Sequence, residues 1–231
     1  MKKLVLTLCI ALIASNTFAD NFEDGFKATQ KGDYKTATPL LKESAKQGNS
    51  MAQVLIGLMY KNGKGLKKNP KEAVNAFRLA AKQGDADGLY NLGAMYDSGQ
   101  GVKQDFKEAA KWYQQAAEKG VTDAQIRLGI MYQSGQGAIQ DFKIAEKWFR
   151  TAAEQGDADA QLILAMVNAS GHGVAVNPIQ AYIWASLAAN NGSHEALKER
   201  DKFASKLDPK QLELARELEK KCLESHYKNC N

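Results

Sequence analysis

The chain carries little excess charge of either sign. Its 231 residues contain 31 Lys and Arg against 26 Asp and Glu, which leaves a formal net charge of +5. A nucleic-acid-binding protein is expected to show a clustered basic face, so this balance does not favour a nucleic acid as partner. Apolar residues make up 44% and charged residues 25% of the sequence. This composition indicates a globular chain with a core rather than a disordered or collagen-like one.

Long apolar runs are missing beyond the first 19 residues. Lys2 and Lys3 precede an apolar run, 4–14, that is too short to span a bilayer, and a small-residue cleavage motif follows at 17–19. These features predict a bacterial secretory signal peptide over residues 1–19, a mature chain that starts at Asp20, and a protein of the periplasm or the medium. Because no later stretch approaches membrane-spanning length, we expect no transmembrane segment after signal cleavage.

Residues typical of catalytic or metal sites are scarce. The chain has three histidines, and His194-Glu195 lacks the second histidine that a metalloprotease helix requires. Residues 225–228 fit Ser-x-x-Lys, but no Ser-Asp-Asn or Lys-Thr-Gly element accompanies them. The Gly-x-Gly elements do not belong to a phosphate-binding loop, since no such loop motif with its Gly-Lys-Ser/Thr ending occurs. The sequence therefore predicts a protein without catalytic residues, cofactor or bound metal.

The 19 glycines of the chain include sets that recur with a fixed period of 36 residues. One periodic set consists of Gly48, Gly84, Gly120, Gly156 and Gly192. A second set consists of Gly57, Gly93 and Gly129, with Ala165 in the fourth place. Self-similarity at one fixed period is the signature of tandem repeats, each of which is one supersecondary unit.

Each 36-residue unit is predicted to form two helices. Apolar residues after the first periodic glycine follow helical spacing, and the first helix then stops at a Gly-x-Gly loop whose glycines allow left-handed turns. An Asn or Asp after this loop is expected to cap a second helix, with Pro at the first helical position in two copies. The expected caps are Asn69, Asp105, Asp141 and Asn177, and the prolines are Pro70 and Pro178.

The glycines of the second set lie inside the first helices and need a steric reason. A glycine inside a helix costs on the order of 1 kcal/mol relative to alanine. Trp112, Trp148 and Trp184 recur in the second helices at the same period. We therefore expect large side chains, these tryptophans in particular, to pack over the glycine positions where the two helices approach closely.

The repeated motif resembles that of a known family. The unit ends in Ala-Ala-x-x-Gly and continues with Ala-x-x-x-Leu-Gly-x-Met-Tyr-x-x-Gly-x-Gly, of which 92–96 is the central part. This pattern closely resembles the Sel1-like repeat, a relative of the tetratricopeptide repeat. The resemblance covers residues 49–192 as four copies, and the fourth departs from the pattern at Ala165, Asn168 and Ala185. Residues 20–48 resemble an ordinary tetratricopeptide hairpin, and residues 193–231 are expected to form a capping helix pair and a tail.

The resemblance implies an all-α fold, a right-handed α-solenoid of antiparallel helix pairs whose first helices line the concave side. It implies a monomeric, non-enzymatic scaffold whose concave face binds a protein, a peptide or another envelope component. One alternative is a scaffold that regulates the periplasmic domain of a membrane sensor. A second is a weak β-lactam-binding or β-lactam-hydrolysing enzyme, as suggested for cysteine-rich relatives, although the cysteine pair that staples each of their repeats is missing here.

Differences between the copies point to a binding face. In the first helices, positions 52, 56, 57, 59 and 60 change little, whereas positions 51, 54, 55 and 58 vary and share one helix face. We call these positions and their equivalents the variable stripe: Met51, Val54, Leu55, Leu58; Asp87, Tyr90, Asn91, Ala94; Asp123, Ile126, Arg127, Ile130; Asp159, Leu162, Ile163, Met166. Within it we expect partner contacts from Tyr90, Asn91, Arg127, Ile130, Leu162 and Met166. Neutral drift after duplication would also produce such variation, so this alternative stays open.

Two cysteines, Cys222 and Cys230, remain after signal cleavage. An even pair in an oxidising compartment predicts a disulfide. Eight residues of continuous helix span about 12 Å, whereas bridged Cα atoms lie within about 7 Å, so the last helix must end near 223–225 and the tail must fold back. Alternatively, Cys222, His226 and Cys230 could be three metal ligands on one helix face, or the two thiols could stay unpaired.

Overall fold

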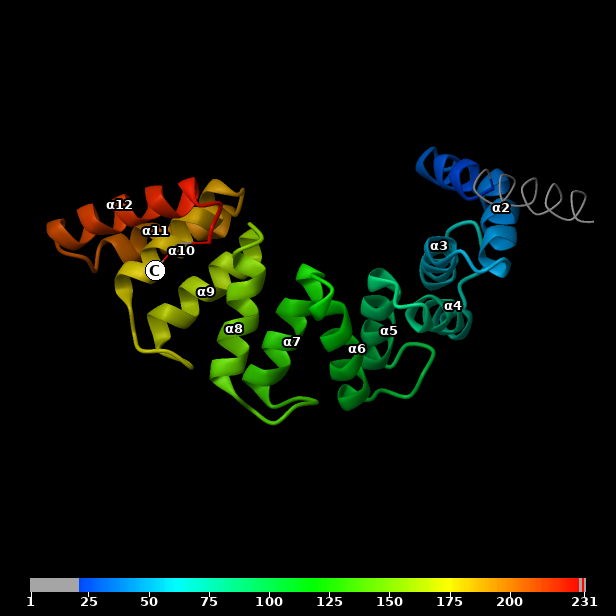
Figure 1. Cartoon of the computed structure of the whole chain (residues 1–231), viewed down its shortest axis with the longest axis horizontal. Helices are drawn as coiled ribbons and strands as arrows, with labels where there is room; N and C mark the ends of the chain where they lie inside the picture. The colour runs from blue at the N-terminus through cyan, green and yellow to red at the C-terminus, as the bar shows by residue number, and fades with distance from the viewer. Residues whose placement is uncertain (1–20, 229, 231) are drawn as a thin grey trace, which may run out of the picture. The chain divides into compact units, whose positions relative to one another are not determined.

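The computed structural model describes residues 21–228 and 230, and every regular element in them is a helix. The predicted signal peptide lies outside the described residues. A first helical stretch covers 21–30. The helices that follow it (Figure 1) are α2 (Tyr34–Lys46), α3 (Ser50–Asn62), α4 (Pro70–Lys82), α5 (Ala86–Ser98), α6 (Phe106–Glu118), α7 (Thr122–Ser134), α8 (Phe142–Ala153), α9 (Ala158–Ser170), α10 (Pro178–Asn190), α11 (His194–Ala204) and α12 (Pro209–Glu224).

Two compact units divide the chain, Met1–Trp112 and Tyr113–Asn231, and we call them the N-terminal and the C-terminal unit. In the N-terminal unit, α2 packs on α3, α3 on α4 and α4 on α5. In the C-terminal unit, α7 packs on α8, α8 on α9 and α9 on α10, and α10 also contacts α11 and α12. Neighbouring helices therefore pack in series, and the predicted all-α solenoid of helix pairs is confirmed.

The helix boundaries follow the predicted caps. Each of α3, α5, α7 and α9 ends at a left-handed glycine, a conformation that a side chain with a Cβ resists. Side chains of Asn69, Asp141 and Asn177 accept the N–H groups that α4, α8 and α10 leave free, and Asp105 does the same before α6. These four predicted N-caps are confirmed, because a short polar side chain is needed wherever a second helix starts.

Close approach of the two helices of a repeat explains the glycines inside α3 and α7. A Cβ built on Gly129 would lie 2.5 Å from Cε1 of Phe149, and one built on Gly57 would clash with Phe77 in the same way. Both phenylalanines are almost completely buried. The predicted close packing is confirmed, but the expectation that tryptophans cover the glycines is wrong, because the covering ring lies one position after the tryptophan position.

The fourth repeat replaces this glycine and ring together. Ala165 of α9 stands where the other copies have glycine, and Ala185 of α10 stands where they have an aromatic ring. Both alanines are fully buried. A methyl group on each helix thus takes the place of a ring on one and a hydrogen on the other, and the packed interior remains filled.

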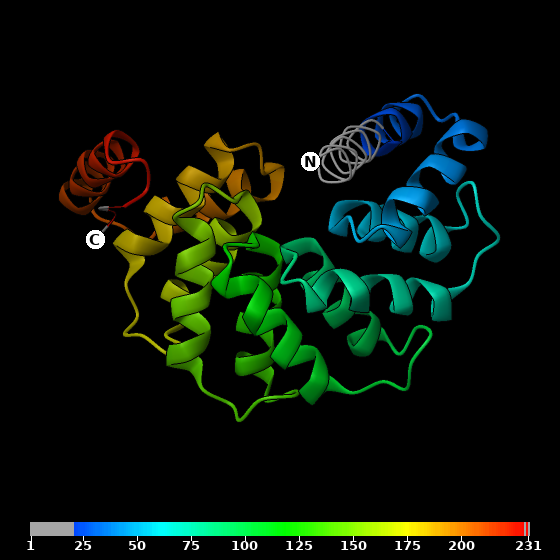
Figure 2. The same cartoon turned by 45° about the vertical axis from the view of Figure 1, so that its right-hand side comes forward.

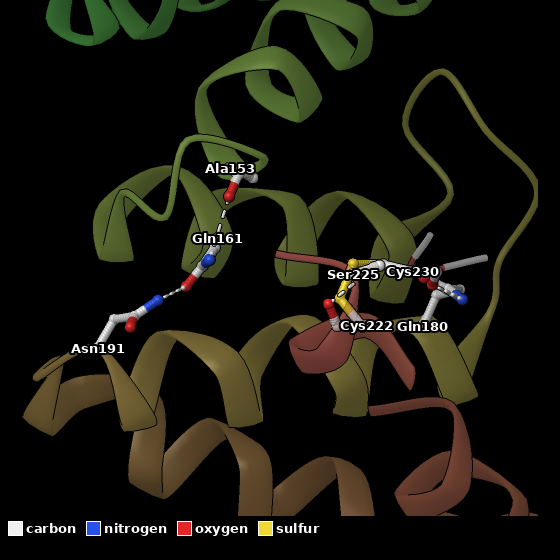
Figure 3. Close-up of a disulfide and its surroundings, with 7 residues drawn as sticks. All are labelled: Ala153, Gln161, Gln180, Asn191, Cys222, Ser225 and Cys230. Atoms are coloured by element: carbon white, nitrogen blue, oxygen red, sulfur yellow. Dashed lines mark hydrogen bonds between the residues drawn. A yellow bond between two sulfur atoms is a disulfide. The ribbon is translucent and has the colours of Figure 1, made fainter. Parts of the chain in front are cut away.

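Buried glutamines connect consecutive repeats, and the sequence patterns above did not identify them. Gln161 of α9 donates to the carbonyl of Ala153 at 3.1 Å and accepts a bond from Asn191 at 2.9 Å, as Figure 3 shows. Gln125 joins Ala117 and Gln155 in the same way. The same two carbonyls accept the N–H groups of Gly156 and Gly120, so each glutamine adds a second hydrogen bond to a helix-end C=O across the repeat boundary.

We predict that Gly129→Ala destabilises the protein. The substitution gains roughly 1 kcal/mol of helix propensity but overpacks a filled interior at a cost of about 1–3 kcal/mol. Circular dichroism should therefore show a melting temperature that is lowered by a few degrees, while the helicity at about 25 °C stays unchanged. Since Gly129→Ala with Phe149→Ala reproduces the Ala165 and Ala185 pair, this double variant should lose less stability than the sum of its single changes. Strict additivity would contradict the packing argument.

Candidate functional site

The variable stripe of the C-terminal unit lies on α7 and α9. Arg127 and Ile130 are exposed on α7, Met166 is exposed on α9, and Leu162 is half-buried. Ile130 is 39% and Met166 46% exposed, so two large apolar side chains one repeat apart present much of their surface outside the core. An exposed apolar surface with a cation beside it is of the kind that a protein partner can cover.

A cleft of about 490 Å³ includes part of this stripe. Its lining consists of Gln133, Leu162, Ile163, Met166, Val167, Ser170 and His172. Four apolar side chains from α9 form most of the wall, and polar groups come from α7, from the end of α9 and from the loop that follows it. The ring of His172 stacks on that of Phe142 with centroids 5.7 Å apart. Apolar walls with a few polar groups can bind an apolar side chain and orient the chain that carries it.

Tyr90 and Asn91 belong to the N-terminal unit, whereas the other four predicted contact residues belong to the C-terminal unit. Both are half-buried on α5. The side-chain amide of Asn91 donates to the carbonyl of Asp87, one turn earlier, at 2.9 Å. Only Leu162 and Met166 of the six predicted residues line the cleft described above.

Part of the variable stripe is packed rather than free. Val54 is only 6% exposed, and Ile126 and Ile163 pack against buried clusters of the C-terminal unit. The variable stripe is therefore only partly free of packing contacts. A first helix has neighbours on two sides, so the edge of the stripe that faces a neighbour contributes to the core, and only the remaining positions are available to a partner.

A second cleft, of about 430 Å³, lies in the N-terminal unit between α2, α3 and α4. Its lining includes Lys42, Lys46, Tyr60, Asn75 and the exposed Leu79. The ammonium group of Lys42 lies 5.9 Å from the centroid of the Tyr60 ring. Sequence comparison between the copies missed this cleft, because it treated position 60 as a packing position.

The predicted disulfide between Cys222 and Cys230 is present, and Figure 3 shows it beside α10. The two Cα atoms lie 4.5 Å apart, and both side chains are buried in the core of the C-terminal unit. The side-chain amide of Gln180, at the start of α10, donates to the carbonyl of Cys230 at 2.6 Å. Since both sulfur atoms are bonded to each other, the alternatives of a metal site and of unpaired thiols do not describe this structure.

The chain reversal before Cys230 depends on two left-handed residues. α12 ends at Glu224, within the predicted range, and His226 and Tyr227 follow with φ values of 52° and 66°. The N–H of Tyr227 bonds to the carbonyl of Cys222, and that of His226 to the carbonyl of Leu223. This pair of bonds is a Schellman motif in which histidine takes the place usually held by glycine.

The tail also completes the last glutamine connection. The hydroxyl of Tyr227 donates to Oδ1 of Asn191 at 3.1 Å, and the amide of Asn191 in turn donates to Gln161. A Cβ built on Gly156 would lie 3.1 Å from the Tyr227 ring, so this ring covers the end of the preceding repeat. The disulfide thus fixes a tail whose side chains close the C-terminal unit.

We predict that Cys222→Ala with Cys230→Ala destabilises the end of the C-terminal unit. In the chain-entropy description, a short closed loop of this kind contributes about 2–3 kcal/mol. Hydrogen exchange should become faster in the last turn of α12 and at Asn191, while α3 and α4 should keep their protection, because a repeat depends mainly on its neighbours. Without reductant, the chain from Asp20 onward should contain no thiol that iodoacetamide can alkylate. Two alkylated cysteines in the folded protein would overturn the disulfide.

Two carboxyl groups of the C-terminal unit have displaced pKa values, and the ion pair with Lys221 lowers that of Glu217. Burial raises the pKa of Glu154 at the end of α8, while the nearby charge of Arg150 opposes this shift and that of Glu146 adds to it. Glu154 does not line either cleft.

Within residues 21–228 and 230, no group of three or more His, Cys, Asp or Glu side chains is placed to hold a metal ion. In this same part of the chain, no helix has the length and apolar character needed to cross a membrane.

Comparison with known proteins gives consistent similarities. A family model described as Sel1 repeat matches residues 50–85, 86–121, 122–157 and 158–193. No curated protein matches the chain. Among solved structures, a Sel1 repeat protein from Oxalobacter formigenes is 34% identical, with a TM-score of 0.72 over 76% of this chain and 72% of that one.

A second solved structure is c5321, a protective antigen of uropathogenic Escherichia coli strains that displays the same type of repeat fold. It is 28% identical, with a TM-score of 0.56, and the similarity covers 94% of this chain. The chain spans 56% of the length of that antigen. The helix pairs described above therefore occur, in the same order, in proteins built from this repeat.

Proposed function

Because the chain belongs to the Sel1 repeat family, we propose that it is a non-enzymatic scaffold that binds a protein or peptide through its variable stripe. Sel1 repeat proteins generally bind other proteins. The cleft beside Leu162 and Met166 is the observation that supports this site most directly. It combines apolar walls, exposed neighbours and a polar rim, whereas the other face of each first helix is used for packing.

The chemistry of the cleft indicates what the partner offers. Leu162, Ile163, Met166 and Val167 suit an apolar side chain, and the flexible thioether of methionine can adapt to its shape. Gln133 and His172 can bond to the backbone of the segment that carries this side chain. On the adjacent face of α7, Arg127 offers a forked cation for a carboxylate. We therefore propose a peptide segment with an apolar anchor and a neighbouring acidic residue.

Tyr90 and Asn91 are proposed as further contacts on α5. An aromatic surface and an amide are residue types that often contribute strongly to protein interfaces. They lie in the N-terminal unit, so their role is tested separately from that of α7 and α9. If Tyr90→Ala with Asn91→Ala leaves capture of the partner unchanged, contacts from α5 are excluded while those of the cleft are not.

The test of the variable stripe in the C-terminal unit compares two sets of exposed substitutions. Arg127→Ala, Ile130→Ser and Met166→Ser together should weaken capture of the partner from an envelope extract by at least tenfold, which corresponds to about 1.4 kcal/mol. Leu214→Ser with Leu223→Ser is the control, because these α12 side chains are similarly exposed. Both variants should keep the melting temperature, since surface changes cost little stability. Equal capture by both variants would favour neutral drift over a binding role.

We also propose that the protein acts outside the cytoplasm. Disulfides persist mainly in oxidising compartments, and the first 19 residues have the pattern of a signal peptide. The similarity to an antigen of pathogenic bacteria is compatible with such a location. Intact mass spectrometry of the protein from its native host should show a chain that begins at Asp20. A species that retains Met1 and sediments with membranes would contradict this proposal.

A further inference from the structure

Five lysines lie in the loop that joins α3 to α4 or at the helix ends that flank it, and together we call them the lysines of the α3–α4 loop. They are Lys61, Lys64, Lys67, Lys68 and Lys71. The last four are exposed and Lys61 is half-buried. No acidic residue occurs between Glu43 and Glu72, and none of the five lysines forms an ion pair with any residue that the structure describes. The positive charge of this loop is therefore left without a partner of opposite sign.

The loop does not need these lysines to fold. In all four repeats, the residue that caps the second helix donates its N–H to the same carbonyl near the end of the first helix. The bonds are Asn69 to Tyr60, Asp105 to Tyr96, Asp141 to Tyr132 and Asn177 to Asn168, at 2.9–3.0 Å. Each loop also contains two glycines with φ values between 69° and 89°. The backbone is the same four times, although the other loops carry mostly neutral residues at the lysine positions.

Position 68 shows that lysine is not the best choice for the loop itself. Gln104 and Gln140 stand at the equivalent positions and donate to the carbonyls of Asp97 and Gln133, at 2.8 and 2.9 Å. The Lys68 side chain makes no hydrogen bond to any described residue. A glutamine would fit the same backbone and satisfy one more carbonyl, so lysine at this position forgoes a local bond.

Neighbouring segments hold the loop in place, and one of them adds two lysines together with the acidic Asp105 and Glu108. The hydroxyl of Thr38 donates to the carbonyl of Tyr34 at 2.7 Å and lies 3.3 Å from the carbonyl oxygen of Gly65. Gly65 also lies so close to Tyr34 that a Cβ there would clash. Gly101 of the α5–α6 loop contacts the backbone at Pro70 in the same way. That second loop is followed by the exposed Lys107 and contains the exposed Lys103. Figure 2 shows both loops at the right-hand side of the N-terminal unit.

We propose that this basic edge, formed by the five lysines of the α3–α4 loop with Lys103 and Lys107, binds the phosphate headgroups of an anionic lipid bilayer. Lysine is a compact, hydrated point charge that suits an array of phosphates, whereas arginine suits bidentate recognition of a single group. Leu66, the apolar residue of the loop, packs against the core of the N-terminal unit. The loop therefore adsorbs to a charged surface and does not insert into the apolar layer.

A bilayer suits this edge better than a nucleic acid does. No arginine and no exposed aromatic ring accompanies the lysines of the loop, so the groups that read or stack on bases are not provided there. The proposed location outside the cytoplasm also favours lipid. Binding by unpaired lysines is additive and depends strongly on salt, because it replaces counterions at the surface.

The test uses the chain from Asp20 onward and phosphatidylcholine vesicles with or without about one third phosphatidylglycerol. The protein should sediment with the anionic vesicles only, and salt should release it. Lys64→Gln with Lys67→Gln and Lys68→Gln should weaken binding on the order of 100-fold. This variant should fold normally, because Gln104 and Gln140 occupy the position of Lys68 in sister loops.

The matched control removes the same charge elsewhere. Lys119→Gln, Lys143→Gln and Lys147→Gln change three exposed lysines of the C-terminal unit, and this variant should retain vesicle binding within about threefold if the edge is responsible. Equal loss in both variants would show an effect of net charge and overturn the site. Vesicle binding that survives the loop substitutions would overturn it as well. If the wild type binds a short DNA duplex more tightly than anionic vesicles at the same salt concentration, the lipid assignment is wrong.

Discussion

The close approach of two helices at a single glycine is the constraint on which the first and third repeats depend. In α3 and α7, the missing side chain lets a phenylalanine ring of the next helix lie directly against the backbone. The same glycine costs helix propensity on the order of 1 kcal/mol, which the packed ring offsets through burial. The ring offsets this cost only when it is fully buried, so the relative position of the two helices is fixed. The orientation of their other side chains and of the loop between them follows.

This constraint divides the surface of a first helix into packed and available positions. Positions that meet the second helix or the next repeat stay nearly unchanged between copies, and the buried glutamines connect one pair to the next. Only part of the remaining surface reaches solvent, as Ile130 and Met166 show. These two exposed side chains can contact a partner without changes to the core, whereas Ile163 and Val167 in the wall of the cleft also pack in the core.

The sequence predicted most of the local structure, because strong local signals coincide with the repeat period. Glycines and short polar residues mark the helix ends at Gly63 and Asn69 and at their equivalents, and physical necessity makes such signals reliable. The Cys222–Cys230 disulfide could likewise be predicted from the even cysteine pair that remains after signal cleavage and from the spacing of the two residues. Side-chain contacts between helices were harder to predict. Nothing in the spacing distinguishes Phe149 from Trp148 as the ring over Gly129, because they stand three and four residues after the buried Ala145 and both positions neighbour it on the helix surface.

The charge of the α3–α4 loop could not be recognised from the repeat pattern either. Recurring motifs consist of residues that the fold requires. The fold does not require the lysines of the α3–α4 loop, so these residues belong to no motif. Their significance emerges only when four loops with one backbone conformation are compared, and Gln104 and Gln140 show what the loop itself prefers. Because glycine pairs and one main-chain bond define this conformation, the side chains between them can change in charge at almost no cost in stability. A repeat of this kind can therefore acquire a charged edge independently of the cleft between its first helices.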